Sequence, residues 1–148
     1  MSDSSAAQTR GRIVVGVDGS KASMDALRWA ARQASLTDAD LETVIAWQLP
    51  VSSGEYAIGV GIDWEDNARK TMNDVVDHAG LAAGQPASRR VVDGHPAQVL
   101  IDTSVGAELL VVGSRGHGGF VGMLLGSVSE HVCAHASCPV LVVRHIEH

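Results

Sequence analysis

Residues 108–119 read ELLVVGSRGHGG, and this stretch decides the fold. Glu108–Val112 is a short aliphatic run without polar alternation, which is typical of a strand that is buried on both faces. The glycine-rich segment Gly113–Gly122 follows it, and a helix is predicted over Leu124–Ala136. A buried strand followed by a helix is the repeating unit of parallel α/β sheets. We therefore expect the rest of the chain to supply more such units.

The flanking sequence repeats this alternation of strands and helices. Four further apolar runs predict strands at Arg12–Asp18, Leu41–Trp47, Arg89–Val92 and Val140–Arg144. Apolar residues at helical spacing predict helices over Ser20–Ser35, Ile62–Ala83 and Ala97–Ser104. Ser20 is a favourable N-cap, Pro96 suits the first turn of its helix, and Val51–Gly61 is predicted to be a loop. The chain is thus predicted to form a doubly wound, Rossmann-like α/β sandwich with a five-stranded parallel sheet and helices on both faces.

The composition excludes several classes of protein. A length of 148 residues fits one domain, with residues 1–10 as a flexible tail and residues 11–148 as the single domain. Eleven basic and seventeen acidic residues give a net charge of −6, which disfavours nucleic acid as a partner. Cys133 and Cys138 are too close in sequence for a stabilising disulfide framework. No apolar run is long enough to span a membrane and no export signal is present, so we expect a cytoplasmic protein without a membrane partner.

The glycine-rich loop carries the strongest functional motif. In a doubly wound sheet, ligands bind at the carboxyl ends of the strands, which directs attention to Asp18, Trp47 and the loop after Val112. The spacing Gly113-x2-Gly116-x9-Gly126-Ser127 brings backbone amides and a helix N-terminus together, and both attract an anion. The hydroxyls of Ser127 and Ser129 add hydrogen-bond donors. The motif is not a Walker A loop, and it predicts a phosphate cradle.

With these residues the chain resembles the universal stress protein family, in its ATP-binding branch with the motif G-x2-G-x9-G-[ST]. The resemblance also covers the first strand and turn at Val14–Ser20, the Gly94-x-Pro96 helix start and the final strand at Cys138–Arg144. It implies a sheet of order 3-2-1-4-5 and a homodimer. It also implies one ATP per subunit, with Mg2+ or Mn2+ held on the phosphates rather than by protein side chains.

The resemblance implies a nucleotide site. Asp18 would hold the adenosine, and Ala46 would meet the adenine through its backbone. The other predicted site residues are Gly16, Val112, Gly113, Arg115, Gly116, Gly126, Ser127, Val128 and Ser129. Two of these residues have a plainer interpretation as well. Asp18 can serve as a turn carboxylate that caps the helix starting near Ser20, and Arg115 is as compatible with solvent as with a phosphate oxygen.

The seven histidines raise a metal hypothesis, which the spacing disfavours. His131 and His135 are four residues apart on a predicted helix, but Cys133 lies about 200° around the helix from His131. A structural zinc site that uses all three is therefore geometrically poor. The simpler interpretation places both histidines on the surface or at a dimer edge, near a helix C-terminus. His95 and His117 are predicted to lie on loops at the ligand-binding edge, where either is a candidate for contact with a phosphate.

The sequence favours a nucleotide-dependent regulatory switch over an enzyme, because no nucleophile with an assigned base and no catalytic carboxylate pair is apparent. The alternatives are a slow Mg2+-dependent ATPase that uses Arg115 or His117, and a sensor of AMP or cyclic AMP. Under the strand order that the resemblance implies, the last strand lies at a sheet edge. We therefore expect its residues Val140, Leu141, Val142 and Val143 to pair with a second copy of the chain.

Overall fold

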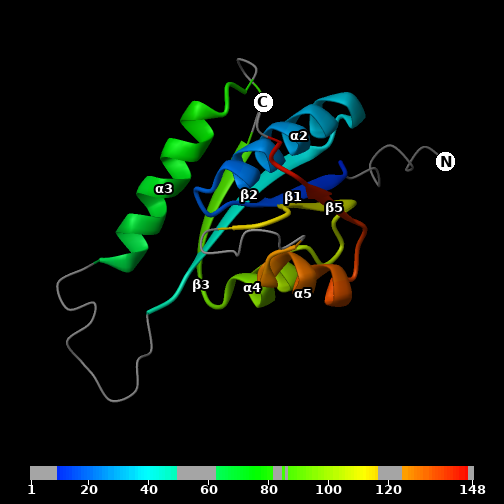
Figure 1. The fold of residues 1–148 in the computed structure, drawn as a ribbon. Helices are drawn as coiled ribbons and strands as arrows, with labels where there is room; N and C mark the ends of the chain where they lie inside the picture. Colours follow the sequence, from blue (N-terminus) through cyan, green and yellow to red (C-terminus); the bar gives the residue numbers. More distant parts are fainter. Residues whose placement is uncertain (1–9, 50–62, 82–84, 86, 117–124, 147–148) are drawn as a thin grey trace.

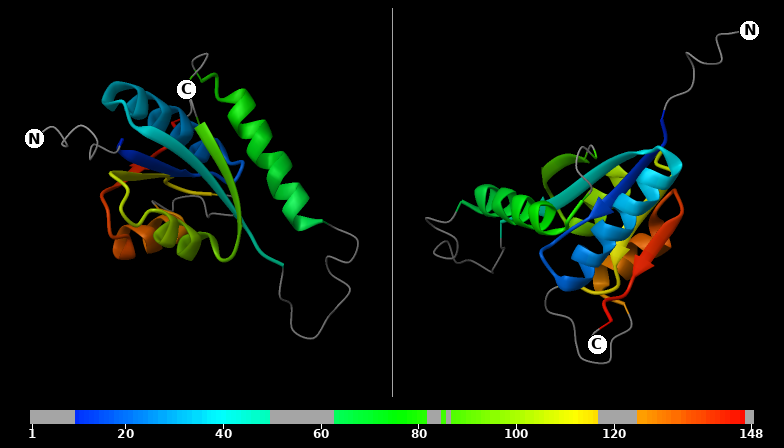
Figure 2. Two further views of the ribbon diagram at one scale, coloured as in Figure 1. Left: turned by 180° about the vertical axis from the view of Figure 1, so that it is seen from behind. Right: turned by 90° about the horizontal axis from the view of Figure 1, so that it is seen from above.

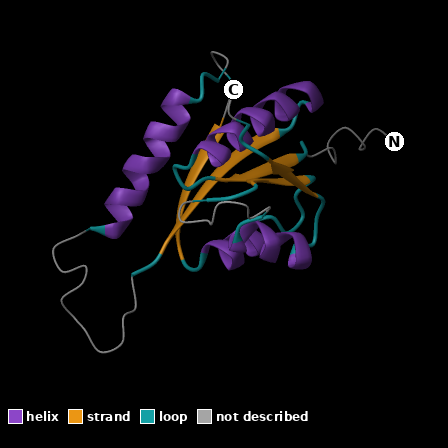
Figure 3. Ribbon diagram, in the orientation of Figure 1, coloured by secondary structure: helices purple, strands orange, loops and turns teal. Residues whose placement is uncertain are grey.

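The computed structural model describes residues 10–49, 63–81, 85, 87–116 and 125–146. Nine elements follow one another in these ranges (Figures 1 and 3). In chain order they are β1 (Arg12–Gly16), α2 (Lys21–Thr37), β2 (Asp40–Trp47), α3 (Trp64–His78), β3 (Ala87–Asp93), α4 (Pro96–Thr103), β4 (Leu109–Gly113), α5 (Ser127–His135) and β5 (Val140–Val143). The alternation of strands and helices that the sequence predicts is therefore confirmed.

The five strands form one parallel sheet in the order β3-β2-β1-β4-β5. The central strand β1 pairs with β2 on one side and β4 on the other, so that Val15 lies beside both Thr43 and Val111. Helices α2 and α3 cover one face of the sheet, and α4 and α5 cover the other (Figures 1 and 2). The fold class and the strand order match the prediction.

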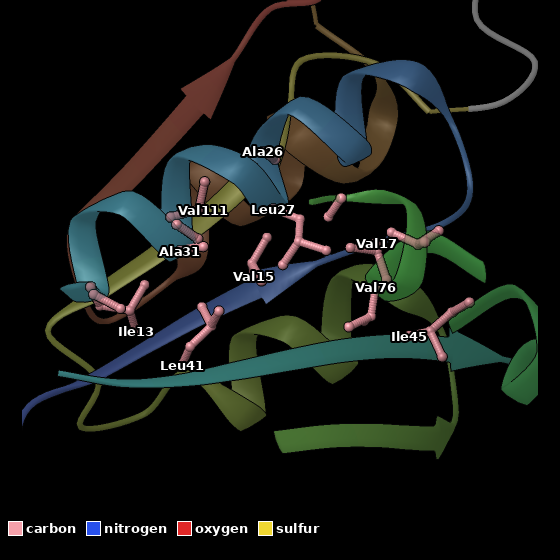
Figure 4. Packing of buried hydrophobic residues seen from close by; sticks show 14 of the residues in the cluster. Ile13, Val15, Val17, Ala26, Leu27, Ala31, Leu41, Ile45, Val76 and Val111 are labelled. Atoms are coloured by element: carbon pink, nitrogen blue, oxygen red, sulfur yellow. The ribbon is translucent and has the colours of Figure 1, made fainter. Parts of the chain in front are cut away.

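The side chains of β1 alternate between two hydrophobic cores. Ile13 and Val15, together with Val17 just beyond the strand, point toward α2 and α3, where they pack with residues such as Leu27 (Figure 4). Val14, from the same strand, packs in the other core with residues of α4 and α5. Because both faces are covered, the strand needs apolar residues at every position, and this explains the absence of polar alternation in the sequence.

Two predicted helices are shorter than their apolar pattern suggests. The helix predicted over Ile62–Ala83 spans Trp64–His78, because the Asp63 carboxylate accepts the Asp66 backbone N–H at 2.9 Å and thereby caps the first turn. Gly80, with φ of +71°, follows its C-cap and ends the helix. The helix predicted from Leu124 begins at Ser127, because Gly126 is extended and acts as its N-cap.

The other boundaries shift by a few residues. β3 spans Ala87–Asp93 rather than Arg89–Val92, because pairing with β2 extends an edge strand whose side chains are largely exposed. Ser20 caps α2 as predicted, since its hydroxyl oxygen accepts the Ser23 backbone N–H. Pro96 occupies the first turn of α4, also as predicted.

Some predictions fall on residues that the structure does not describe. They concern residues 1–9 of the tail, the loop Val51–Gly61, and His117 with the adjoining glycines of the glycine-rich loop. Arg10, at the start of the described chain, forms ion pairs with Asp38 and Asp40. Cys133 and Cys138 are both free thiols. Within the described ranges, no helix combines the length and the apolar character that a membrane crossing requires.

Candidate functional site

A cavity of about 640 Å³ opens at the carboxyl ends of β1 and β4, the two strands between which the order of the sheet reverses. Its wall includes residues from β1, β2 and β4, and from the first turns of α2, α4 and α5. In sheets of this topology, the edge at the strand reversal is where ligands bind. The cavity is thus placed where the topology predicts a ligand.

Every residue of the predicted nucleotide site lies on the wall of this one cavity. These residues are Gly16, Asp18, Ala46, Val112, Gly113, Arg115, Gly116, Gly126, Ser127, Val128 and Ser129. They come from four separate stretches of the sequence, and the fold brings them together. Their contacts with a ligand remain a prediction.

The N-terminus of α5 forms the anion-attracting end of the cavity. Gly126 is its N-cap, and no side chain caps this helix. The first backbone N–H groups of an α-helix have no partner within the helix, and they carry the partial positive charge of the helix dipole. Ser127 is exposed beside them. This end of the cavity therefore offers both hydrogen-bond donors and a favourable potential to a phosphate group.

The two serines of α5 have different roles in the structure. The buried Ser129 hydroxyl donates a hydrogen bond to the Gly113 carbonyl, which ties the first turn of α5 to the end of β4. The Gly126 backbone N–H makes a second link between these segments, because it donates to the Ser114 carbonyl at 2.6 Å. Ser129 thus positions the helix, and Ser127 is the hydroxyl that is exposed at the cavity.

Asp18 lies in the turn between β1 and α2 and is exposed at the edge of the cavity. Its Oδ1 accepts the Ser20 backbone N–H at 2.9 Å, and its own backbone N–H donates to the Ser23 hydroxyl at 3.2 Å. The turn interpretation of Asp18 is therefore confirmed. Its other oxygen, Oδ2, lies beside Gly116, where an added Cβ would come within 2.2 Å. A glycine at 116 lets the loop after β4 approach this carboxylate.

Two further glycines permit close packing around the cavity. A Cβ on Gly113 would lie 2.7 Å from the Ala22 carbonyl carbon and 2.9 Å from the Ser23 backbone nitrogen, so β4 and the first turn of α2 touch through backbone atoms. A Cβ on Gly16 would lie 2.6 Å from a Leu100 methyl group. These contacts bring α2 and α4 against the sheet at the cavity.

Sequence reasoning missed part of the wall. Val44 and Leu100 line the cavity together with Pro96 and Glu130. Val44 and Leu100 belong to the core beneath α4 and α5, so their signal in the sequence is the same as that of any core residue. The Gly94-x-Pro96 helix start was the available signal for α4.

A second hollow, of about 280 Å³, adjoins the cavity at Asp18 and Ala46, which line both. Trp47, at the end of β2, and Trp64, at the start of α3, are part of its wall. Asp18, the end of β2 and the loop after Val112 therefore meet at one edge of the sheet, as the topology predicts.

Of the two histidines predicted as candidates for contact with a phosphate, the structure describes His95. His95 caps α4, with its Nδ1 accepting the Ala97 backbone N–H at 3.2 Å, and it is absent from the residues that line the described cavity. The contact that the structure shows for His95 is this local cap, and its contact with a phosphate stays a prediction. His117 lies outside the described residues.

The family model and the sequence relatives that match this chain are all universal stress proteins. The family model described as the universal stress protein family matches residues 9–144. A universal stress protein of Mycobacterium tuberculosis is 42% identical over 138 residues, and one of Mycolicibacterium smegmatis is 37% identical over 146 residues. These matches cover 89% and 96% of this chain but 44% and 48% of the relatives. The chain therefore spans less than half the length of these two relatives.

Solved structures show the same fold. The crystal structure of a universal stress protein in complex with cAMP is 28% identical, with a TM-score of 0.67, and the match covers 93% of this chain and 98% of the other. The structure of protein MJ0577 is 20% identical with a TM-score of 0.75, over 95% and 100% of the two chains. Because protein MJ0577 is only 20% identical, its similarity supports the fold and nothing further.

Proposed function

The chain belongs to the universal stress protein family, and we propose that it is a regulatory protein that binds one adenine nucleotide in the cavity beside β1 and β4. The observation that carries this proposal is the N-terminus of α5, which has no side-chain cap and lines the same cavity as Asp18 and Ala46. The solved relative in complex with cAMP, 28% identical, supports an adenine nucleotide as the ligand class.

The proposed pose follows the chemistry of the wall. The phosphates lie at Gly126 and Ser127, where backbone N–H groups and the helix dipole stabilise negative charge. Arg115, an exposed residue that lines the cavity, supplies a positive charge for the phosphates. The adenosine lies toward Asp18, which accepts hydrogen bonds from hydroxyl or amino groups, and toward the backbone of Ala46.

We propose ATP with Mg2+ or Mn2+ as the physiological ligand. Among the residues that the structure describes, no three His, Cys, Asp or Glu side chains gather into a metal cluster. At nucleotide sites Mg2+ is commonly held mainly by phosphate oxygens and water, so the proposed cation does not require a cluster of protein ligands. When bound, the cation would neutralise part of the phosphate charge. Nucleotide occupancy then acts as a switch in the cytoplasm, and we assign no catalytic residue.

Cyclic AMP or AMP is the second candidate ligand, because the solved relative carries cAMP. A titration of nucleotide-free protein with ATP, AMP, cyclic AMP and GTP, with and without Mg2+, distinguishes the candidates. We expect ATP with Mg2+ to bind more tightly than GTP. If cyclic AMP binds more tightly than ATP, cyclic AMP takes the place of ATP as the proposed ligand. Release of inorganic phosphate over time would favour the slow ATPase.

We further propose that the protein is a homodimer through β5. This strand is at the end of the sheet order and pairs with β4 on one side, which leaves its other edge open within the described chain. Leu141 is a large apolar residue that is 36% exposed on this strand. An open, apolar edge strand favours pairing with another strand, and a second copy related by a twofold axis supplies one.

Sedimentation equilibrium tests the dimer. We expect wild-type protein to be dimeric at micromolar concentration and Leu141→Glu to be monomeric, because a carboxylate at the edge disfavours strand pairing. The matched control is Leu36→Glu, at an apolar residue that is 75% exposed on α2. A monomeric wild type, or a Leu141→Glu variant that remains dimeric, would exclude this interface.

A further inference from the structure

Two exposed histidines form a close pair on α5. His131 and His135 are one helical turn apart, and their ring centroids are 4.5 Å apart with the ring planes tilted by 45°. His135 is the last residue of the helix, so the pair lies on its final two turns. We propose that this pair is a surface binding site for a divalent transition-metal cation of the Ni2+, Cu2+ and Zn2+ group.

The spacing suits bidentate binding of one cation. Side chains at positions i and i+4 of a helix lie on the same face, one above the other. Metal–imidazole bonds are about 2.0–2.1 Å long, so two neighbouring ligand nitrogens lie about 3 Å apart. Rings whose centres are 4.5 Å apart reach that separation with small side-chain rotations, which exposed residues make freely. Neutral imidazole is also the preferred nitrogen ligand for these metals.

The surrounding charge favours a cation at this position. The last turn of an α-helix carries the partial negative charge of its dipole, which stabilises positive charge near His135. The whole chain has a net charge of −6, which also attracts cations. The helix therefore attracts phosphate at its first turn and a metal ion at its last.

The site is open and does not serve to hold the fold together. Across the described ranges, no third His, Cys, Asp or Glu joins the pair in a metal cluster. Cys133 is exposed, but it is two residues from each histidine and so lies on another side of the helix. Water or an external ligand completes the coordination, so the site differs from the three-residue zinc site that the sequence disfavours. A bound cation bridges two successive turns and stabilises the C-terminal half of α5.

The experiment is calorimetric titration of the untagged, full-length protein with NiCl2 in a non-coordinating buffer. We expect one Ni2+ per chain, and we expect His131→Gln and His135→Gln each to weaken binding by about tenfold or more. Cys133→Ser and His78→Gln are expected to retain wild-type affinity. His78 is an exposed histidine on α3 whose Nδ1 already contacts the Asp74 carbonyl at 2.7 Å.

A spacing control distinguishes the effect of the His131–His135 spacing from the effect of the number of histidines. The double variant Cys133→His/His135→Gln keeps seven histidines, but it places two of them two residues apart, about 200° around the helix. We expect it to lose the tight Ni2+ site. Wild-type affinity in this variant, or in both single histidine variants, would overturn the proposal. As a second readout, Zn2+ should shift the imidazole NMR signals of His131 and His135 in wild-type protein, and unchanged signals would also overturn it.

Discussion

At the scale of single residues, Asp18 combines a structural and a proposed binding role. One carboxylate oxygen accepts the Ser20 backbone N–H at 2.9 Å and holds the turn before α2. The other oxygen lies beside Gly116 at the edge of the cavity. The sequence left both interpretations open, because a carboxylate at the end of a buried strand suits a turn and a nucleoside equally well. The turn contact is observed, and the contact with adenosine is the part to test.

Substitution of Asp18 separates the two roles. Asp18→Asn keeps an oxygen for the Ser20 N–H and removes the charge, so we expect unchanged stability and roughly fivefold weaker nucleotide binding, about 1 kcal/mol. Asp18→Ala also removes the turn acceptor, so we expect unfolding to become easier by about 1 kcal/mol. Urea denaturation measures the stability and calorimetry the affinity. If both variants bind nucleotide with wild-type affinity, Asp18 is not part of the binding site.

Alanine substitutions at two glycines of the cavity wall, Gly113 and Gly126, should have different effects. Gly113→Ala would place a methyl group 2.7–2.9 Å from atoms of the first turn of α2, so we expect a loss of about 1–3 kcal/mol of stability. A Cβ on Gly126 would lie 3.3 Å from the Arg115 Cα, which requires a smaller shift, so we expect a smaller loss of stability than in Gly113→Ala and weaker nucleotide binding. Denaturation midpoints and calorimetry on both variants check this contrast. Equal losses of stability would contradict the packing argument.

At the scale of elements, α5 shows how one helix combines packing and binding. The buried Ser129 hydroxyl is bonded to the Gly113 carbonyl, and Ser127 is exposed at the cavity. We expect Ser129→Ala to cost about 1 kcal/mol of stability and Ser127→Ala to leave stability unchanged. Ser127→Ala should instead weaken nucleotide binding severalfold. If Ser129→Ala unfolds at the same urea concentration as wild type, the hydrogen bond to Gly113 does not stabilise the fold.

The elements also show what the sequence can predict. The buried strands and the helices between them follow from apolar patterning, because a sheet covered on both faces needs it at every strand position. The ends of helices depend on single contacts instead. The Asp63 cap that starts α3 and the extended Gly126 before α5 override an apolar pattern that continues beyond them. β3 is longer than predicted, because its pairing with β2 supplies backbone hydrogen bonds that its weakly apolar sequence does not reveal.

At the scale of the whole molecule, the site depends on the topology. The predicted site residues come from separate stretches of the chain. They lie together because a parallel sheet places the carboxyl ends of all its strands at one edge. The resemblance to the family, together with the rule that ligands bind at strand carboxyl ends, predicts these positions. Val44 and Leu100 could not be predicted, because a core residue beneath a cavity and one beneath a helix have the same sequence pattern.

The length of the molecule also bears on its assembly. The chain spans 44% and 48% of two mycobacterial relatives, so each of them contains about as much additional chain again. The proposed dimer through β5 would bring a second copy of this fold to the edge where the sheet ends.

The most direct measurement is to denature the purified protein, identify any released nucleotide by chromatography and mass spectrometry, and titrate the emptied protein with ATP, AMP and cyclic AMP. We expect an adenine nucleotide to be recovered, and we expect the emptied protein to bind one equivalent at a site that Gly126→Ala weakens. If no adenine nucleotide is recovered and none of the three binds, the cavity is not an adenine-nucleotide site.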